Sequence, residues 1–186
     1  MALQSFRHVL PPTFRGANSQ VDFSENSFPR HLINQVTVSR KLFVRVRDDS
    51  QQRVYLELTL PRDVETVFLV ALSISSLNPG IVPDHYSEQA EVGTWFELGV
   101  IKAHEDAEPE LPRHIIQQYN YSALVPRLHT IVVNEEDSDD KKWLQKLRAG
   151  DVLQLYPRAR VPGWVNAVRE ATMEVQYIRT EEDMYE

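Results

Sequence analysis

The chain contains no cysteine among its 186 residues. Disulfide bonds, thiolate metal sites and cysteine nucleophiles are therefore all excluded. Because a chain without disulfides fits a reducing compartment, the sequence favours a cytoplasmic protein.

Long apolar runs are also missing. The longest run, VFLVALSISSL at 67–77, is shorter than the about 20 residues that a membrane-spanning helix needs. The N-terminal segment MALQSFRHVLPP has no continuous apolar stretch of the kind found in secretion signals. Mitochondrial targeting is a minor alternative, because Arg7 is present and no acid precedes Asp22, but Pro11 and Pro12 would break the amphipathic helix that it requires.

An excess of positive charge is absent too, since the formal net charge is −7. This balance disfavours a general nucleic-acid binder, which normally carries a basic face, and a polybasic protein of membrane surfaces. We therefore expect neither a nucleic-acid partner nor a membrane partner. Arginine outnumbers lysine by fifteen to five, so a local basic patch suited to bidentate recognition remains compatible with the composition.

The sequence lacks the usual short catalytic motifs. It contains no G-x-S-x-G elbow, H-E-x-x-H pair, P-loop or G-x-G-x-x-G fingerprint. The six histidines show no ligand spacing, so we predict no metal site and no cofactor. No catalytic residue is identified, and we expect that the chain is not an enzyme.

Period-two alternation is the main pattern that is present. In VTVSRKLFVRVRD (36–48), Val44 and Val46 alternate with Arg45 and Arg47, as in a strand with one face in water. The turn-like DDSQQ separates this segment from RVYLELTL (53–60), which predicts a hairpin over 36–60.

The segment 64–77 is a buried helix or a strand, and its β-branched and aromatic residues favour a strand. In the last predicted strand, Ala171, Met173, Val175 and Tyr177 share one face. In all, six further segments are predicted as strands: 64–77, 94–103, 114–121, 128–135, 151–161 and 171–178. Gly99 interrupts the second of them and predicts a bulge there. A short helix is predicted over 139–148, ended by Gly150. The charge run EEDSDDKK (135–142) is interpreted as an exposed loop.

About eight strands and one short helix predict a mainly β fold, a single-domain antiparallel β-sandwich of jelly-roll or galactose-binding-like type. The predicted boundaries are an irregular N-terminal arm at 1–30, the sandwich domain at 31–178 and an acidic tail at 179–186.

The turn at Pro162-Gly163 provides the most specific candidate site. Trp164 follows it, Arg158 and Arg160 precede it on one strand face, and Asn166 comes just after, which suggests a polar-aromatic ligand surface at one end of the sandwich. The alternative is structural: Trp164 closes the end of the core, and Asn166 bonds nearby backbone groups. We expect Trp164 to be mainly a core-capping residue and Arg158 to point to solvent or to a partner.

Three segments together resemble a known module. TWFEL (94–98), W-L-x-x-L-x-x-G-D-V-L-x-L (143–155) and R-A-R-V-P-G-W-V-N-A-V-R-E-A (158–171) are similar to a β-rich module of many uncharacterised proteins of filamentous fungi, where it sometimes accompanies ankyrin-like regions. The resemblance covers about residues 94–178. It implies a fungal β-sandwich and supplies no catalytic residue.

Two classes of function remain open from the sequence. The first is a non-enzymatic binding module whose partner is a protein or a second copy of the chain, with a glycan or a small molecule as further possibilities. The second is a small-molecule-binding barrel or an enzyme of secondary metabolism. In that case the pocket would be lined by His114, His129, Tyr119 and Glu97.

Overall fold

The computed structural model describes residues 33–47, 53–77, 94–103, 113–117, 126–159 and 165–180, with the backbone alone for 113–117. Within these residues the strands are β1 (Ile33–Arg40), β2 (Val44–Val46), β3 (Leu56–Thr59), β4 (Val64–Leu77), β5 (Thr94–Ile101), β6 (Arg113–Gln117), β7 (Arg127–Asn134), β8 (Val152–Ala159) and β9 (Asn166–Arg179). The helix α1 (Ser138–Leu144) follows β7.

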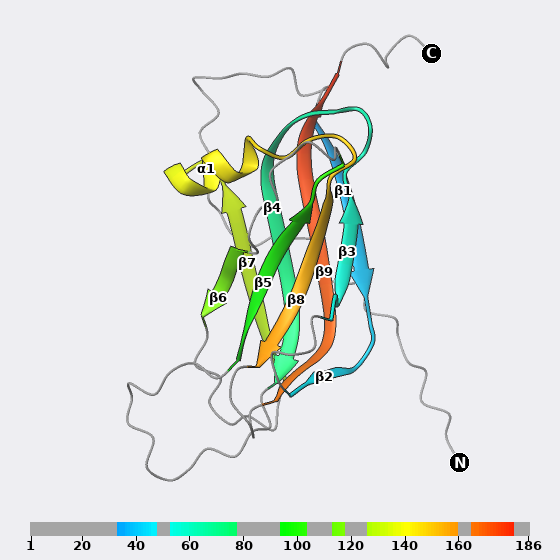
Figure 1. Ribbon diagram of the computed structural model, residues 1–186, viewed down its shortest axis with the longest axis vertical. Coiled ribbons are helices and arrows are strands. Elements are labelled where there is room, and N and C mark those ends of the chain that lie inside the picture. Colours follow the sequence, from blue (N-terminus) through cyan, green and yellow to red (C-terminus); the bar gives the residue numbers. More distant parts are fainter. Residues whose placement is uncertain are drawn as a thin grey trace, which may run out of the picture.

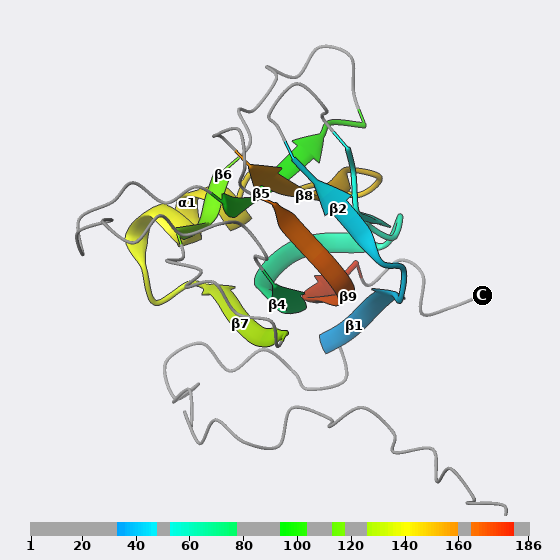
Figure 2. The same ribbon diagram turned by 90° about the horizontal axis from the view of Figure 1, so that it is seen from below.

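The strands form two antiparallel sheets that pack face to face (Figures 1 and 2). Sheet A has the order β1-β9-β4-β7, with β2 also pairing with β9, and sheet B has the order β3-β8-β5-β6. The predicted mainly β, antiparallel sandwich with one short helix is therefore confirmed. Since the strands belong to two separate sheets, the described residues do not form a closed barrel.

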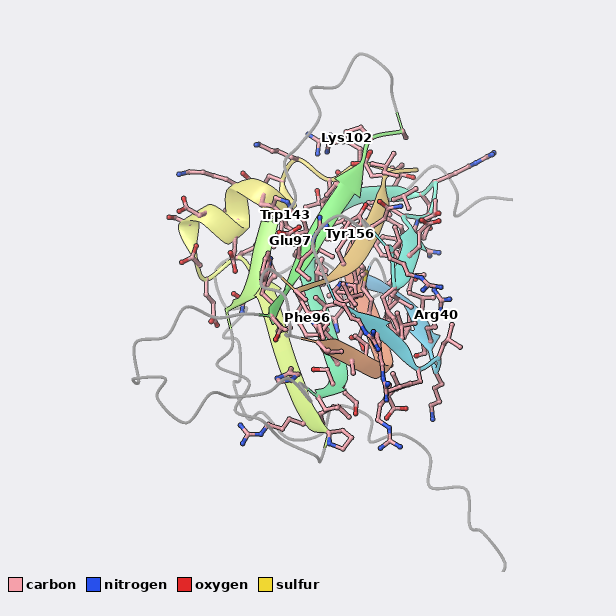
Figure 3. The ribbon with its side chains drawn as sticks, turned by 60° about the horizontal axis from the view of Figure 1, so that its bottom comes forward. Arg40, Phe96, Glu97, Lys102, Trp143 and Tyr156 are labelled. Carbon is pink, nitrogen blue, oxygen red and sulfur yellow. The ribbon has the colours of Figure 1, made fainter. Side chains whose placement is uncertain are left out.

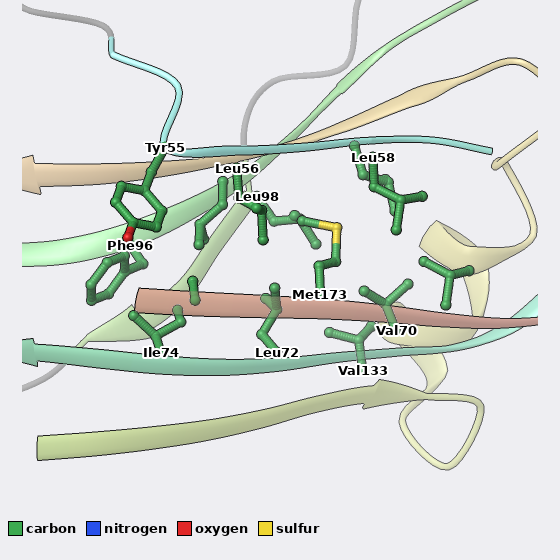
Figure 4. Packing of buried hydrophobic residues seen from close by; sticks show 14 of the residues in the cluster. Tyr55, Leu56, Leu58, Val70, Leu72, Ile74, Phe96, Leu98, Val133 and Met173 are labelled. Atoms are coloured by element: carbon green, nitrogen blue, oxygen red, sulfur yellow. The ribbon is translucent and has the colours of Figure 1, made fainter. Parts of the chain in front are cut away.

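The core lies between the sheets and is built by the alternating residues of each strand. In β9, Ala171, Met173, Val175 and Tyr177 all face inward and are buried, as the alternation predicts. Figure 4 shows Met173 between residues of both sheets, among them Leu98 and Leu72. Each fully buried aliphatic side chain of this kind stabilises the fold by about 1.5–3 kcal/mol.

The predicted hairpin over 36–60 is wrong. β1 pairs with β9 in sheet A, whereas β3 pairs with β8 in sheet B, so the two segments lie in different layers. Leu56 and Leu58 lie opposite Leu155 and Leu153, and all four side chains enter the core. Alternation fixes which face of a strand is buried, but it does not identify the neighbouring strand.

Gly99 does not form the predicted bulge, because the β5–β8 register runs without a shift from Thr94 to Ile101. Its role is a close approach: a Cβ built on Gly99 would lie 2.9 Å from Cε2 of Tyr156. The aromatic ring therefore lies directly over the glycine.

The charge run at 135–142 contains the start of the helix as well as a loop. Asp137 is the N-cap of α1, and its Oδ1 accepts hydrogen bonds from the backbone N–H groups of Asp139 and Asp140 at 2.8 and 3.1 Å. The helix ends at Leu144, before the predicted position 148. Gly150 has a φ of 81°, a left-handed conformation that favours glycine.

Asp151 connects the segment after the helix to sheet B. Its carboxylate is 1% exposed and accepts hydrogen bonds from the N–H groups of Ala103 and Arg148, and its Oδ2 lies 3.1 Å from Nζ of Lys102. The Gly-Asp pair before β8 thus has a structural role. No helix of the described residues is long and apolar enough to span a membrane.

Candidate functional site

A row of polar side chains covers the outer face of sheet B. Alternate residues of β8 place Leu153, Leu155 and Ala159 in the core, so the residues between them face outward. We call this set the outer polar row, and its members are Glu57, Gln154, Tyr156, Arg158, Glu97 and Trp95.

Arg158 and Glu97 form the charged part of the outer polar row. Nε of Arg158 donates to Oε2 of Glu97 at 2.8 Å, and Nε1 of Trp95 donates to Oε1 of the same carboxylate at 2.9 Å. The three residues are at most 8% exposed. The strand register places Trp95 directly opposite Arg158, which explains why these residues meet.

Tyr156 continues the row toward β3, and Figure 3 shows Glu97 and Tyr156 on neighbouring strands. Its hydroxyl donates to Oε1 of Gln154, whose Nε2 donates to Oε2 of Glu57 at 2.7 Å. Burial raises the pKa of Tyr156, and the positive charge of Arg158 opposes that rise. The phenol therefore keeps its proton at neutral pH and acts as a donor.

Asn166 ties the two sheets together at one end of the sandwich. It lies at the start of β9, is fully buried, and its Nδ2 donates to the carbonyl oxygens of Trp95 and Arg158 at 2.9 and 3.2 Å. Its Oδ1 has no hydrogen-bond partner in the part of the chain that the structure describes. The amide thus bonds the ends of β5 and β8, which is a structural role.

His129 lies in the core, between the sheets. Its Nε2 is 3.0 Å from Oγ of Ser76, and its ring centroid is 6.3 Å from that of Phe96. Burial lowers the pKa of His129 below 6.5, and the nearby positive charge of Arg127 lowers it further. The imidazole is therefore neutral in the folded protein at neutral pH.

The structure brings together some of the sequence candidates and separates others. Arg158 contacts both Glu97 and Asn166, although the sequence placed Glu97 in a different site. His129 belongs to β7 of sheet A and faces the inner side of sheet B, where it lies beside Phe96. Glu97 lies on the outer side of sheet B. These two residues therefore do not line one pocket.

Four candidates lie wholly or partly beyond the described structure. Trp164, Arg160 and Tyr119 fall outside the described residues. For His114 the backbone alone is described, and it lies opposite Glu97 in the β5–β6 register.

The expected orientation of Arg158 is wrong. The residue does lie on the outer face of its strand, but it is 7% exposed and does not point into solvent. Its charge is paired with Glu97 of the neighbouring strand, a partner that the sequence of its own strand does not reveal.

Two exposed edges of sheet A were missed by the sequence analysis. On β7, Leu128 is 65% and Val132 is 47% exposed. At the opposite edge, Leu42 is 45% and Phe43 is 49% exposed. For Phe43 the signal was present, since this residue stands on the predicted wet face of 36–48, whereas no wet face was predicted for 128–135.

Metal binding has no support in the described residues. Among them, no three histidine, aspartate or glutamate side chains gather as a metal site would require. The carboxylate of Glu97 is used by Arg158 and Trp95, and that of Asp151 by Lys102 and two backbone groups.

No family model matches the chain. No curated protein matches it either, so the resemblance to the fungal module stays a prediction. Among solved structures it is similar to the crystal structure of the infectious bursal disease virus VP2 subviral particle, with a TM-score of 0.42 and 9% identity over 80% of this chain and 38% of that chain. It is also similar to the structure of infectious bursal disease virus Gx strain, with a TM-score of 0.37 and 7% identity over 81% of this chain and 37% of that one. The chain spans well under half the length of both, and likenesses at these TM-scores carry no functional conclusion.

Proposed function

We propose that this chain is a non-enzymatic interaction module that docks a partner strand along β7, and that the strand it accepts is β7 of a second copy. The observation that carries the proposal is the exposed apolar face of this edge strand. Leu128 and Val132 are 65% and 47% exposed, and β7 pairs with β4 on one side, with no described strand on the other. Such an edge is a template for adding a strand.

The two edges of sheet A differ in how well they are protected. At the β1–β2 edge, β1 exposes polar side chains at Gln35, Thr37 and Ser39. The segment after it is interrupted at 41–43 and carries Lys41, Arg45 and Arg47, which oppose strand addition. Between Arg127 and Asn134, β7 is uninterrupted and contains no other lysine, arginine or acid. The β7 edge is therefore the one that favours pairing.

A second β7 strand complements the first. If two copies pair antiparallel about Thr130, Leu128 of each lies opposite Val132 of the other, and the two Thr130 residues face one another. Apolar cross-strand pairs of this kind stabilise a sheet by about 0.2–1 kcal/mol each, in addition to the new backbone hydrogen bonds. The two copies of sheet A would then form one continuous sheet.

The enzymatic alternative gains no comparable support from the described residues. Two candidates whose side chains the structure describes are used within the fold, since Glu97 binds Arg158 and His129 bonds Ser76. They also lie in different layers, so they do not converge on one reacting atom.

Sedimentation velocity of the intact chain tests the proposal. We expect a dimer at micromolar concentration, and we expect the double variant Leu128→Lys/Val132→Lys to weaken association at least about tenfold, a loss of about 1.4 kcal/mol. Leu42→Lys, which changes an exposed leucine at the other edge, is the matched control and should leave association unchanged.

A second measurement uses a labelled peptide with the sequence of residues 127–134. It should bind the wild-type chain and not the double lysine variant, whose circular dichroism should match that of wild type. A wild-type chain that stays monomeric at high micromolar concentration and does not bind this peptide would overturn the proposal.

A further inference from the structure

The segment 41–47 follows β1, contains β2 and lies at the edge of sheet A opposite β7 (Figure 2). Lys41, Phe43, Arg45 and Arg47 stand at every second position of this segment and are exposed, while Val44 and Val46 between them are buried. We call the four exposed residues the basic strip.

The backbone beneath the basic strip is held in place by a buried tyrosine. The hydroxyl of Tyr55, which is 1% exposed, donates its proton to the carbonyl oxygen of Leu42 at 2.9 Å and lies 3.3 Å from the carbonyl oxygen of Arg40. Nη1 of Arg40 returns a hydrogen bond of 2.7 Å to the carbonyl oxygen of Tyr55. Exposed apolar groups on a fixed backbone lose little conformational freedom when a partner binds.

The charges of the basic strip are largely unneutralised. Lys41 lies 3.5 Å from Glu170, whereas Arg45 and Arg47 have no carboxylate within ion-pair distance among the described residues. Cζ of Arg45 lies over the ring of Phe43, 5.1 Å from the ring centroid, so the guanidinium and the ring form a cation–π pair. Arg169, next to the β9 residue that pairs with Val44, adds a further exposed cation.

We infer that the basic strip binds an extended acidic peptide segment of another protein, with carboxylates at alternate positions. Residues two apart on a strand are about 6.6–6.8 Å apart, so alternate carboxylates of an extended peptide match the spacing of Arg45 and Arg47. Guanidinium groups recognise carboxylates through paired hydrogen bonds. Phe43, at the next alternate position, offers an apolar contact to the peptide residue that follows the acids on the same face.

A peptide fits these features better than an anionic membrane does. The whole chain carries a net charge of −7, which opposes approach to an extended anionic surface. A short peptide responds mainly to charges within the screening length of about 8 Å, and there it meets Arg45 and Arg47, which have no carboxylate within ion-pair distance among the described residues. One half-exposed phenylalanine also supplies little area for insertion into a bilayer.

Fluorescence anisotropy with a labelled peptide that alternates aspartate and valine tests the inference. We expect salt-sensitive binding that weakens at least about tenfold in Arg45→Ala/Arg47→Ala and severalfold in Phe43→Ala. Arg62→Ala, which removes an exposed arginine elsewhere, is the matched control and should bind as wild type does. The substituted side chains are all exposed, so circular dichroism should show that each variant keeps the wild-type fold; they are Phe43, Arg45, Arg47 and Arg62.

Two outcomes would overturn the inference. The first is peptide binding that is absent, or that is equal in the wild-type chain and the double arginine variant. The second is cosedimentation with phosphatidylserine vesicles that depends on Arg45 and Arg47 while the peptide does not bind. The β7 variant Leu128→Lys/Val132→Lys should keep peptide binding, so the two proposals fail independently.

Discussion

At the scale of single residues, several polar groups inside this protein are bonded to one another. Glu97 accepts from Arg158 and Trp95, and Asn166 donates to two carbonyl oxygens. Burying such groups costs free energy unless hydrogen bonds replace those lost to water. Removing one partner of such a buried bond therefore lowers the free energy of unfolding more than removing the same type of residue from an exposed position.

Arg158→Ala should destabilise the fold by about 3–5 kcal/mol, because it removes the guanidinium that lies 2.8 Å from the buried carboxylate of Glu97. This replaces the expectation that follows from the sequence, namely that Arg158 is exposed and dispensable. A urea titration measures the effect. Lys142→Ala, which removes the exposed partner of Asp139, should leave the midpoint almost unchanged, and equal midpoints for the two variants would contradict the buried pair.

His129 should make stability depend on pH. Its folded pKa is below the ordinary 6.5, so the unfolded chain takes up a proton that the folded chain rejects. Stability is therefore present above pH 6.5 and is lost as the pH falls from 6.5 toward the lowered folded pKa, with a slope of at most about 1.4 kcal/mol per pH unit. His129→Gln lacks this titration, so its stability should fall less than that of wild type between pH 7.5 and 5. Parallel stability curves would show that the histidine does not contribute.

At the scale of secondary-structure elements, neighbouring strands define what each residue does. Tyr156 of β8 lies over Gly99 of β5, so the absence of a side chain on one strand makes room for a ring on the next. The two edges of sheet A also differ in their strands. β7 is one uninterrupted strand, whereas the other edge is interrupted between β1 and β2 and is basic there.

Gly99→Ala should destabilise the protein by about 1–3 kcal/mol, because the new methyl group would meet the Tyr156 ring at 2.9 Å. If this clash is the cause, adding Gly99→Ala to a Tyr156→Ala background should cost much less than adding it to wild type. The four unfolding free energies form a double-mutant cycle. An additive cycle would mean that the ring does not restrict position 99.

At the scale of the whole molecule, the sandwich is stabilised by its apolar core and by hydrogen bonds, including those that the carboxylate of Asp151 accepts from the N–H groups of Ala103 and Arg148. Neither the sequence nor the described residues provides a set of ligands for a structural metal.

We therefore predict that a chelator leaves the melting temperature unchanged, because no group of side chains among the described residues is suited to hold a metal whose removal would destabilise the fold. Differential scanning calorimetry with and without EDTA checks this. A decrease of several degrees that added zinc or calcium reverses would contradict it.

The sequence by itself determined the class of the fold and the approximate place of most strands. Period-two alternation grouped Ala171, Met173, Val175 and Tyr177 on one face, because successive side chains of a strand point to opposite faces. It also placed Phe43 on the wet face of 36–48, although the significance of this residue was not recognised, and it did not separate β1 from β2 within that segment.

Only the tertiary structure decided which strands are neighbours and which outward residues are buried. Ser39 hydrogen-bonds Thr172 across 133 positions of sequence, and Arg158 meets Glu97 across 61. Pairings over such distances depend on how whole sheets pack, and no local pattern contains them. For the same physical reason the hairpin over 36–60 and the exposed position of Arg158 were wrong, while the fold class was right.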